Sequence, residues 1–369
     1  MARLRAFIKN VLAFALGTLL ALLLVEGVLR VYNPFETRVR GDRIVLPAGK
    51  RYAFNNPAIP GLDPRIVHTK NSLGFRGPEP PPAGLEAVLS VVTVGGSTTE
   101  CFYLSDGRDW PAVLQDSLRT RFPDAWVNNA GLDGHSTYGH AILVDDYLAG
   151  LRPRYTLFLV GLNDVGRENF AQTAAQVKGR VQWGSLEGFV KSLAAYSEAA
   201  SLGLNGYRYL RARMLGLPHQ AVDVENLPLV ETDELDPASL LAPHQERYLP
   251  AYRSRLQALV RRTRAAGLTP ILITQPALYG PGIDPSTGVD LGRILVGGAS
   301  GAAGWTVLEA YNQVTRDVGA EESLLVIDLA HLLERDSRYY YDFVHFNNEG
   351  AARVAALIYQ PLAAYLASV

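Results

Sequence analysis

Five short runs of branched apolar residues, with helical patterns between them, constrain the fold of this chain most. These runs are nearly continuous in Val, Ile and Leu rather than alternating, as expected for strands buried on both faces of a parallel sheet. Strands that alternate with helices build layered α/β folds. The sequence therefore predicts a three-layer α/β/α sandwich around a five-stranded parallel sheet. The predicted strands are 89–94, 126–130, 155–160, 270–274 and 324–328.

The segments between the strands carry their own start and stop signals. Residues 109–122 place apolar side chains at i, i+3 and i+4, with Asp109 as the expected helix cap and Pro111 in the first turn. The stretch 165–250 interrupts the alternation, and we predict an insertion there over one end of the sheet. Residues 279–304 are rich in glycine and are predicted to form a second loop.

The first 32 residues have the composition of a membrane segment. No residue between Val11 and Val25 is charged, and apolar flanks extend this run to about the 20 residues with which a helix crosses a bilayer. Lys9 and Glu26 lie near its ends, where a charge is tolerated best. A cleaved signal peptide and a buried core helix are the alternatives. No small-x-small cleavage site follows the Leu-rich run, so we favour an uncleaved anchor at residues 1–32.

Charged residues around this segment bear on its orientation. Arg3, Arg5 and Lys9 favour a cytoplasmic N-terminus, whereas arginines beyond the apolar run oppose it. We expect the bulk of the chain outside the cytoplasm, on the periplasmic or cell-surface side. Residues 33–88, rich in Pro, Gly and Arg, form the expected lead-in and linker, and 89–369 form the main domain.

The overall charge and the single cysteine argue against several classes of function. With a formal net charge of -1, the chain offers no basic surface for nucleic acid. Cys101 cannot form an internal disulfide, and no Cys/His spacing provides the ligands of a structural zinc site. We therefore expect neither a nucleic-acid partner nor a metal or other cofactor.

Polar residues gather just after the predicted strands. Ser97 follows the first strand, Gly134 the second and Asn163 the third, while Asp342 and His345 lie between the last strand and the final helix. In open parallel sheets the ligand crevice lies beyond the carboxyl ends of the strands. We therefore expect these five residues to meet at one edge of the sheet.

These residue types suit nucleophilic catalysis. A hydroxyl group such as that of Ser97 needs an imidazole to take its proton and a carboxylate to orient that imidazole. His345 and Asp342, three residues apart, can supply both from one turn. The oxyanion that forms on attack needs fixed donors. Gly134 can present a backbone N–H, and Asn163 can add its side-chain amide beside the N–H of Ser97.

In this arrangement the chain resembles the SGNH, or GDSL-like, hydrolase superfamily. Its four blocks are matched in order by "GGSTT", "NAGLDGHST", "GLND" and "DFVH", over about residues 89–368. The resemblance implies a flavodoxin-like sandwich and a metal-free serine esterase. It also implies the role of each residue: Ser97 the nucleophile, His345 the general base, Asp342 its orienter, and Ser97, Gly134 and Asn163 the oxyanion hole.

The first block departs from the name of the superfamily, Gly-Asp-Ser-Leu. Gly96 stands where that name has aspartate, so the block keeps the serine without this carboxylate. The nucleophile elbow of other α/β serine hydrolases, G-x-S-x-G, is disfavoured because position 99 is a threonine. Residues 71–79, "NSLGFRGPE", resemble the segment before the serine block in membrane-anchored members.

Each of these residues also has a purely structural interpretation. A Gly-Gly-Ser after a strand is often only a loop, Gly134 could serve only as a turn, and Asn163 only as a helix cap. We favour the catalytic interpretation because the four blocks come in the right order and in the right strand context.

Other titratable residues near the blocks allow two interpretations. His135 and His140, with Asp145 and Asp146, could suggest a metal site, but we expect them to cap and face a helix. Cys101 lies just past the first block. Because no basic partner is visible beside it, we expect a small buried side chain rather than a reactive thiol.

Three further residues are candidates for substrate binding. Arg167 follows the third block, and Gln275 and Tyr279 follow the fourth predicted strand, so all three are expected near the crevice. Turn chemistry explains Gln275 and Tyr279 nearly as well. A solvated surface arginine is the alternative for Arg167.

The sequence and the resemblance together predict a membrane-anchored, extracytoplasmic serine esterase. Its expected substrate is an acyl ester of a lipid or of an acylated glycan. Two other classes of function remain as alternatives. The acyl group could pass to a sugar hydroxyl of a cell-envelope polysaccharide, which would make the protein an O-acyltransferase. The second alternative is a non-catalytic envelope binding protein, although such a protein would not require Ser97, Asp342 and His345 together.

Overall fold

The computed structural model of the chain describes residues 2–32, 39–40, 43–56, 58–167, 193, 197–203, 206, 219–230 and 237–368. Most of the expected insertion at 165–250 therefore lies outside the described residues. The chain divides into two units, of which the first is Met1–Val45 with Gln172–Pro218 and the second Leu46–Ala171 with His219–Val369.

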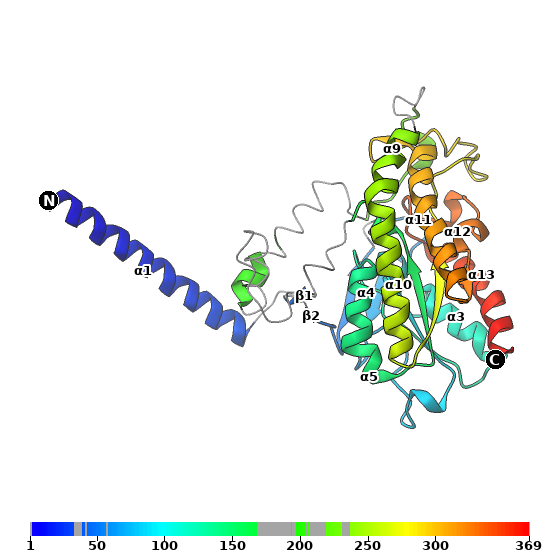
Figure 1. Cartoon of the computed structure of the whole chain (residues 1–369), viewed down its shortest axis with the longest axis horizontal. Helices are drawn as coiled ribbons and strands as arrows, with labels where there is room; N and C mark the ends of the chain where they lie inside the picture. Colours follow the sequence, from blue (N-terminus) through cyan, green and yellow to red (C-terminus); the bar gives the residue numbers. More distant parts are fainter. Residues whose placement is uncertain are drawn as a thin grey trace. The chain divides into compact units, whose positions relative to one another are not determined.

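A five-stranded sheet lies at the centre of the second unit (Figure 1). Its strand order is β11-β8-β7-β5-β6, and all neighbouring strands are parallel. All five predicted runs are strands of this sheet, so the predicted architecture is confirmed. The bounds are β5 Ser90–Gly95, β6 Trp126–Asn129, β7 Tyr155–Val160, β8 Thr269–Thr274 and β11 Val326–Ile327.

The strand order places a ligand crevice at a defined point of the sheet. From β5 the chain first adds β6 on one side and then crosses to add β7 on the other. Such a reversal opens a crevice at the carboxyl ends of the two strands that flank it. The first and third sequence blocks follow these two strands directly.

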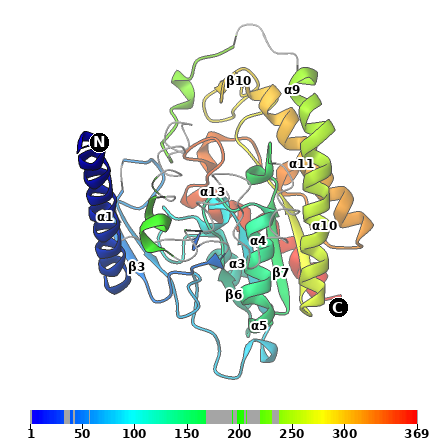
Figure 2. The same ribbon diagram turned by 60° about the vertical axis from the view of Figure 1, so that its left-hand side comes forward.

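Helices cover both faces of the sheet (Figures 1 and 2). One layer pairs α3 (Trp110–Arg119) with α13 (Asn348–Leu366). The other packs α10 (Leu249–Ala265) against α4 (Thr137–Leu143) and α11 (Gly301–Glu321). Because both faces are covered, every residue of β5 and β7 is buried. Continuous apolar strands are the sequence signature of such a sheet.

The remaining elements are short, apart from the first helix. The strands β3 and β4 form an antiparallel hairpin in the lead-in, ahead of the sheet. The elements are α1 Ala2–Val31, α2 Ser97–Glu100, α5 Ala149–Leu151, α9 Pro237–Pro243, α12 Leu329–Leu332, β1 Val39–Arg40, β2 Arg43–Ile44, β3 Arg51–Asn55, β4 Arg65–Thr69, β9 Leu295–Val296 and β10 Ala299–Ser300.

The structure corrects two local predictions. The loop predicted over 279–304 is wrong at its end, where β9 and β10 pair and α11 begins at Gly301 with Ser300 as its cap. Asp109 precedes α3 as predicted, but its side chain caps nothing. The carboxylate instead accepts a hydrogen bond from Asn129 Nδ2 at 2.9 Å and lies 3.5 Å from Arg76, so a buried ion pair takes the place of the cap.

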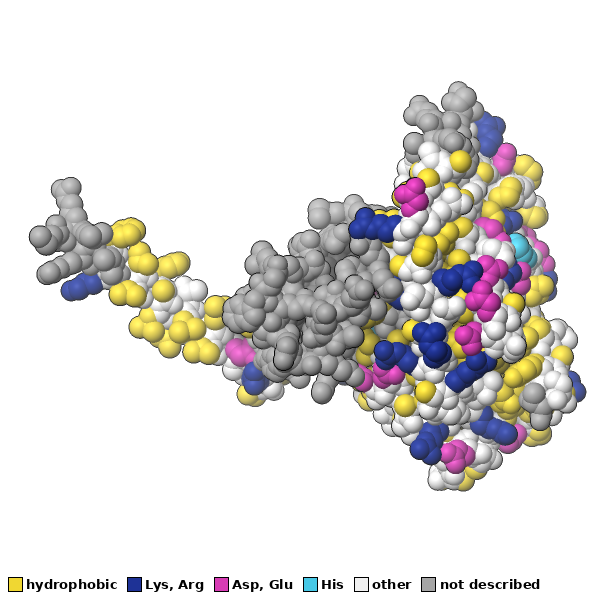
Figure 3. Space-filling model, in the orientation of Figure 1, with side chains coloured by type: hydrophobic (Ala, Val, Ile, Leu, Met, Phe, Trp, Pro, Cys, Tyr) yellow, Lys and Arg dark blue, Asp and Glu magenta, His cyan; other side chains and the backbone are white. Residues whose placement is uncertain are grey.

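The first unit contains the apolar helix α1. Its segment Lys9–Val31 is long and apolar enough to cross a membrane, and most of its large apolar side chains are exposed (Figure 3), whereas Leu29 is buried. Near its end, Glu26 accepts hydrogen bonds from Ser197 Oγ at 2.8 Å and from the N–H groups of Glu198 and Ala199 at 3.2 and 3.1 Å. The carboxylate of α1 therefore caps the first turn of a short helix from the insertion.

His140 makes the stability of the second unit depend on pH. Burial in α4 lowers the pKa of this imidazole from 6.5 to about 4. In the unfolded chain the His140 imidazole binds a proton below pH 6.5, whereas in the folded chain it stays neutral down to about pH 4. Each pH unit in this window removes about 1.4 kcal/mol from the free energy of unfolding.

We expect His140→Leu to flatten this part of the stability curve. Urea unfolding between pH 7 and about pH 4 measures the slope. His331→Leu is the matched control because the His331 side chain is exposed. A slope that His140→Leu leaves unchanged would contradict the assignment.

Candidate active site

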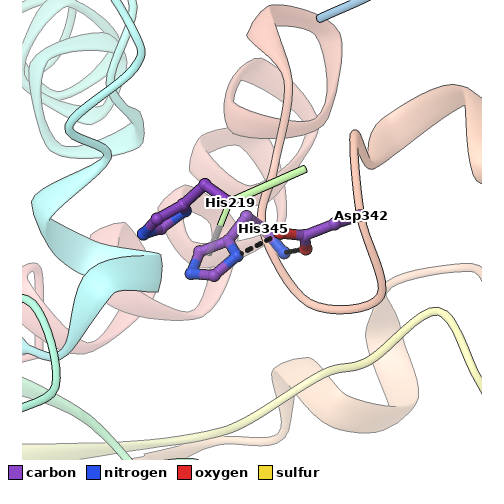
Figure 4. A group of neighbouring side chains, drawn as sticks. All are labelled: His219, Asp342 and His345. Carbon is purple, nitrogen blue, oxygen red and sulfur yellow. Dashed lines mark hydrogen bonds and ion pairs between the residues drawn. The ribbon is translucent and has the colours of Figure 1, made fainter. Parts of the chain in front are cut away.

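Three side chains from distant parts of the sequence form a hydrogen-bonded chain. Ser97 Oγ lies 2.7 Å from His345 Nε2, and His345 Nδ1 lies 2.6 Å from Asp342 Oδ2. All three side chains are half-buried, so they combine restricted solvent with access from outside. Figure 4 shows the imidazole of His345 facing the carboxylate of Asp342. The geometry is that of a hydroxyl, a base and an orienting acid.

The tight turn after β5 holds Ser97 at the carboxyl end of the sheet. The strand ends at Gly95, and α2 starts at Ser97 after a single connecting residue. Cys101 ends this short helix in the left-handed conformation, with its N–H bonded to the carbonyl of Ser97 at 2.9 Å. Burial raises the pKa of the Cys101 thiol to about 12, so the cysteine is the inert buried residue that the sequence predicts.

The turn before α13 holds Asp342 and His345 in fixed positions relative to each other. Asp342 Oδ1 accepts hydrogen bonds from the backbone N–H groups of Val344 at 2.9 Å and His345 at 2.7 Å. Burial favours the neutral acid, but His345 and these N–H groups outweigh it and lower the pKa of Asp342. Asp342 is therefore ionised at neutral pH and holds the proton on His345 Nδ1.

Asn163 and Gly96 lie in direct contact beside the serine. Asn163 follows β7 and donates from Nδ2 to the carbonyl of His135 at 3.0 Å. A Cβ atom built on Gly96 would lie 2.2 Å from this same Nδ2. The departure from the Gly-Asp-Ser-Leu pattern thus has a local reason, because the amide of Asn163 occupies the space that a side chain at position 96 would fill.

We expect Gly96→Ala to lower kcat about tenfold, because it displaces the Asn163 amide without removing it. The backbone at position 96 has no left-handed strain, so the variant should fold. Steady-state ester hydrolysis measures the effect. Gly150→Ala is the matched control, since a Cβ there meets no atom within 4 Å. Full activity in Gly96→Ala would show that the position of the amide is unimportant.

The loop after β6 carries Gly134, and a buried ion pair fixes its position. Gly134 is exposed and has a φ of 71°, in the left-handed region that favours glycine. The N–H of the preceding Asp133 donates to Glu100 Oε2 at 2.7 Å. Glu100 in turn lies 3.6 Å from Lys70 Nζ, with both side chains buried. This pair ties the loop of Gly134 to the helix that starts at Ser97.

Asp164 organises the other side of the site, which the sequence motif alone did not reveal. The carboxylate is buried and accepts from Thr137 Oγ1 at 2.6 Å, from the N–H of Thr137 at 3.1 Å and from Arg255 at 3.0 Å. It therefore joins the turn that carries Asn163 to the start of α4. The position of Asp164 directly after Asn163 in "GLND" is the one sequence feature that could have indicated a role at the site.

Arg76 supports the turn that carries Ser97, and no sequence pattern indicated this role. Its guanidinium is buried and donates to the carbonyls of Glu100 at 2.9 Å, Cys101 at 2.6 Å and Leu104 at 2.8 Å. Arg76 belongs to the motif "NSLGFRGPE", which the sequence had marked only by resemblance. The lead-in segment therefore contributes Arg76 to the buried hydrogen-bond network that supports α2 and Ser97.

His219 is a second imidazole at the site, and no sequence motif marked it. Its ring lies beside that of His345 (Figure 4), with 4.1 Å between the ring centroids. Its Nδ1 lies 2.7 Å from the hydroxyl of Tyr341. Burial, followed by the charge of His345, lowers the pKa of His219 to about 4. The imidazole is therefore neutral at neutral pH.

The three candidate substrate-binding residues have different surroundings. Gln275 is buried, accepts from Thr98 Oγ1 at 3.1 Å and donates to Pro276, which fits a supporting role beneath α2. Tyr279 is also buried, and burial raises the pKa of its hydroxyl to about 12. Arg167 is exposed, as expected for a surface arginine or for a group that meets substrate.

The residues weighed as a metal site do not form one in the described part of the chain. His135 accepts from Asn163 through its carbonyl, His140 is buried in α4, and Asp145 pairs with Arg262. Among the described residues, one group of three has suitable ligand atoms close together. It consists of His219, Asp342 and His345.

One family model matches most of the chain. Residues 93–353 match the model of the GDSL-like Lipase/Acylhydrolase family. No curated protein sequence matches the chain at a significant level.

Solved structures show a distant likeness. The α/β hydrolase LAE5 from the metagenome of Lake Arreo is 16% identical, covers 74% of this chain and 94% of its own, and has a TM-score of 0.41. The acetylxylan esterase Axe2 from Geobacillus stearothermophilus is 15% identical, with 74% and 93% covered and a TM-score of 0.41. TesA is 17% identical, with 74% and 97% covered and a TM-score of 0.39.

These structural likenesses are too low to add to the family match. That match extends over well more than half of the sequence and includes the blocks of Ser97, Gly134, Asn163 and His345. The chain belongs to the GDSL-like lipase/acylhydrolase family.

Proposed function

We propose that the protein is a membrane-anchored, extracytoplasmic esterase that cleaves O-acyl or O-acetyl esters through an acyl-serine intermediate. Membership of the family makes it a serine hydrolase of ester bonds. The observation that carries the mechanism is the chain from Ser97 Oγ to His345 at 2.7 Å and on to Asp342 at 2.6 Å.

In the first half of the proposed reaction, Ser97 Oγ attacks the carbonyl carbon of the ester. Its proton passes to His345 Nε2, while Asp342 holds the opposite ring nitrogen and stabilises the imidazolium. The negative charge moves to the carbonyl oxygen. The N–H groups of Ser97 and Gly134 and the amide of Asn163 would receive this oxyanion. His345 then protonates the departing alcohol, and the acyl-serine remains.

The second half of the reaction frees the enzyme. Water enters where the alcohol left, His345 removes its proton, and the resulting hydroxide attacks the acyl carbon. The same donors bind the second oxyanion, and the proton on His345 returns to Ser97 as the carboxylic acid leaves. An acceptor hydroxyl in place of this water would give acyl transfer.

Substrate profiling separates these outcomes. The full chain in detergent is offered short and long acyl esters and acetylated glycans, first alone and then with an added glycan acceptor. Release of free acid in proportion to alcohol supports hydrolysis. Acylated acceptor as the main product would replace the esterase proposal by an acyltransferase, and no turnover of any ester would favour a binding protein.

The contact of Glu26 supports a retained anchor. This carboxylate lies in α1 and caps a short helix that begins at Glu198, within the same unit. Cleavage after the apolar segment would remove that cap. A leader that is removed would not be expected to supply the cap of a helix that remains in the mature chain.

We therefore expect the mature protein to keep its apolar N-terminus in the membrane fraction. Mass spectrometry of the N-terminal peptide, with protease accessibility of intact cells or spheroplasts, measures both retention and side. A mature N-terminus beyond Val31, or a catalytic domain that is protected from outside, would contradict the proposal.

A further inference from the structure

Three metal-ligating side chains meet at the edge of the hydrogen-bonded chain. His219, Asp342 and His345 each offer a ligand atom, and these atoms lie within 4.8 Å of one another (Figure 4). Asp342 and His345 are expected in a serine hydrolase, and two ligands hold a metal ion weakly. His219 is the additional residue that completes a set of two imidazoles and one carboxylate, which suits zinc.

The surroundings of His219 fit a metal ligand. The hydroxyl of Tyr341 lies 2.7 Å from Nδ1 and fixes the ring through a hydrogen bond, as partners outside the ligand shell do in zinc sites. Tyr341 is itself held, because its N–H donates to the carbonyl of His345 and its own carbonyl accepts from Val222. The ligand atoms of a tetrahedral ion lie about 3.3 Å apart. The three ligand atoms here lie within 4.8 Å of one another, so small side-chain movements would bring them to that spacing.

We propose that His219, His345 and Asp342 form an inhibitory site for a borderline-soft divalent cation such as Zn²⁺. The ion replaces the proton that Asp342 and His345 share, and this proton leaves to solvent. No electron transfer is involved. The fourth position is open to water.

Bound metal would stop ester cleavage, a consequence that rests on the proposed function. His345 must accept the proton of Ser97, and a cation on the imidazole withdraws the electron density that makes it a base. The carboxylate of Asp342 is also diverted from orienting the ring. The metal is thus an inhibitor of a metal-free reaction, not a cofactor.

Binding is measured directly, without any substrate. Co²⁺ titrated into the full, metal-stripped chain in detergent should give the visible absorption of a tetrahedral site, saturate at one equivalent and be displaced by Zn²⁺. His219→Gln should weaken binding about tenfold or more. Ser97→Ala should bind as the unmodified chain does, because its ligands are intact.

A surface histidine provides the control. His331 is exposed and lies 2.8 Å from Asp328 and 3.2 Å from Glu309, so it is the competing place for a cation. His331→Gln should leave the cobalt spectrum unchanged. Loss of the spectrum in His331→Gln, or its persistence at full affinity in His219→Gln, would overturn the proposal.

Inhibition is measured as a ratio to the metal-free rate of each variant. Zn²⁺ should inhibit the unmodified enzyme reversibly, with recovery on addition of chelator, while Mg²⁺ should not. His219→Gln should need about tenfold more Zn²⁺ for half-inhibition. Equal sensitivity in both would refute the site. A protein that binds Co²⁺ through His219 but cleaves no ester would refute the esterase and leave the metal site standing.

Discussion

Ser97→Ala is expected to reduce kcat for ester hydrolysis about 10⁶-fold, to the level supported by the oxyanion donors alone. The hydroxyl lies 2.7 Å from His345 Nε2, and no other group in the proposed reaction carries the acyl chain. Steady-state kinetics on an activated ester measures the loss. Alanine at this position removes one atom from a half-buried side chain, so the fold should remain.

A second serine separates this effect from general damage. Ser117 lies in α3, and its hydroxyl bonds the carbonyl of Val113 in the same helix. Ser117→Ala should therefore keep full activity. If Ser97→Ala retained more than a small fraction of the rate, the acyl-serine mechanism would be wrong even though the family assignment stands.

Asn163→Asp is expected to lower kcat about 10²–10³-fold with little change in KM. The substitution keeps the shape of the side chain but replaces the donor amide by a carboxylate, which repels the developing oxyanion. Because the charge appears only in the transition state, the loss should fall on kcat rather than on substrate binding. Asn163→Ala should give a loss of similar size.

The matched control for this donor is Asn226, an exposed asparagine whose amide bonds Asp223. Asn226→Ala should leave both constants unchanged. Unchanged kcat in the two Asn163 variants would make this residue a structural element that holds the carbonyl of His135. A loss confined to KM would place it in substrate binding instead.

The strands and the blocks could be predicted because their signals are local. Burial on both faces makes a strand continuously apolar, and 155–160 coincides with β7 for this reason. The proximity of the residues in the four blocks could be predicted because the carboxyl ends of parallel strands lie at one edge of the sheet. Ser97 and His345 meet there as expected.

The supporting residues could not be predicted, since their roles depend on contacts between distant segments. Arg76 donates to four backbone carbonyls in and just after α2, and it is held there by backbone pairing with Asn129, which is distant in the sequence. Asp109 looked like a helix cap because the nearby Asn129 and Arg76 are separated from it in sequence.

His219 shows the same limit for the site itself. Its neighbours in the sequence form no strand pattern and no catalytic block. Only the folded chain reveals that its ring lies against His345. A histidine in a loop carries no local sign that it faces another imidazole.

The most direct test of the account is to map a fluorophosphonate adduct by mass spectrometry. The probe forms a stable bond with a serine that is activated by a neighbouring base. We expect one adduct, on the peptide that contains Ser97, strong in the unmodified chain and lost in His345→Ala. An adduct on another residue, or labelling of Ser97 that persists at full rate without His345, would contradict the account.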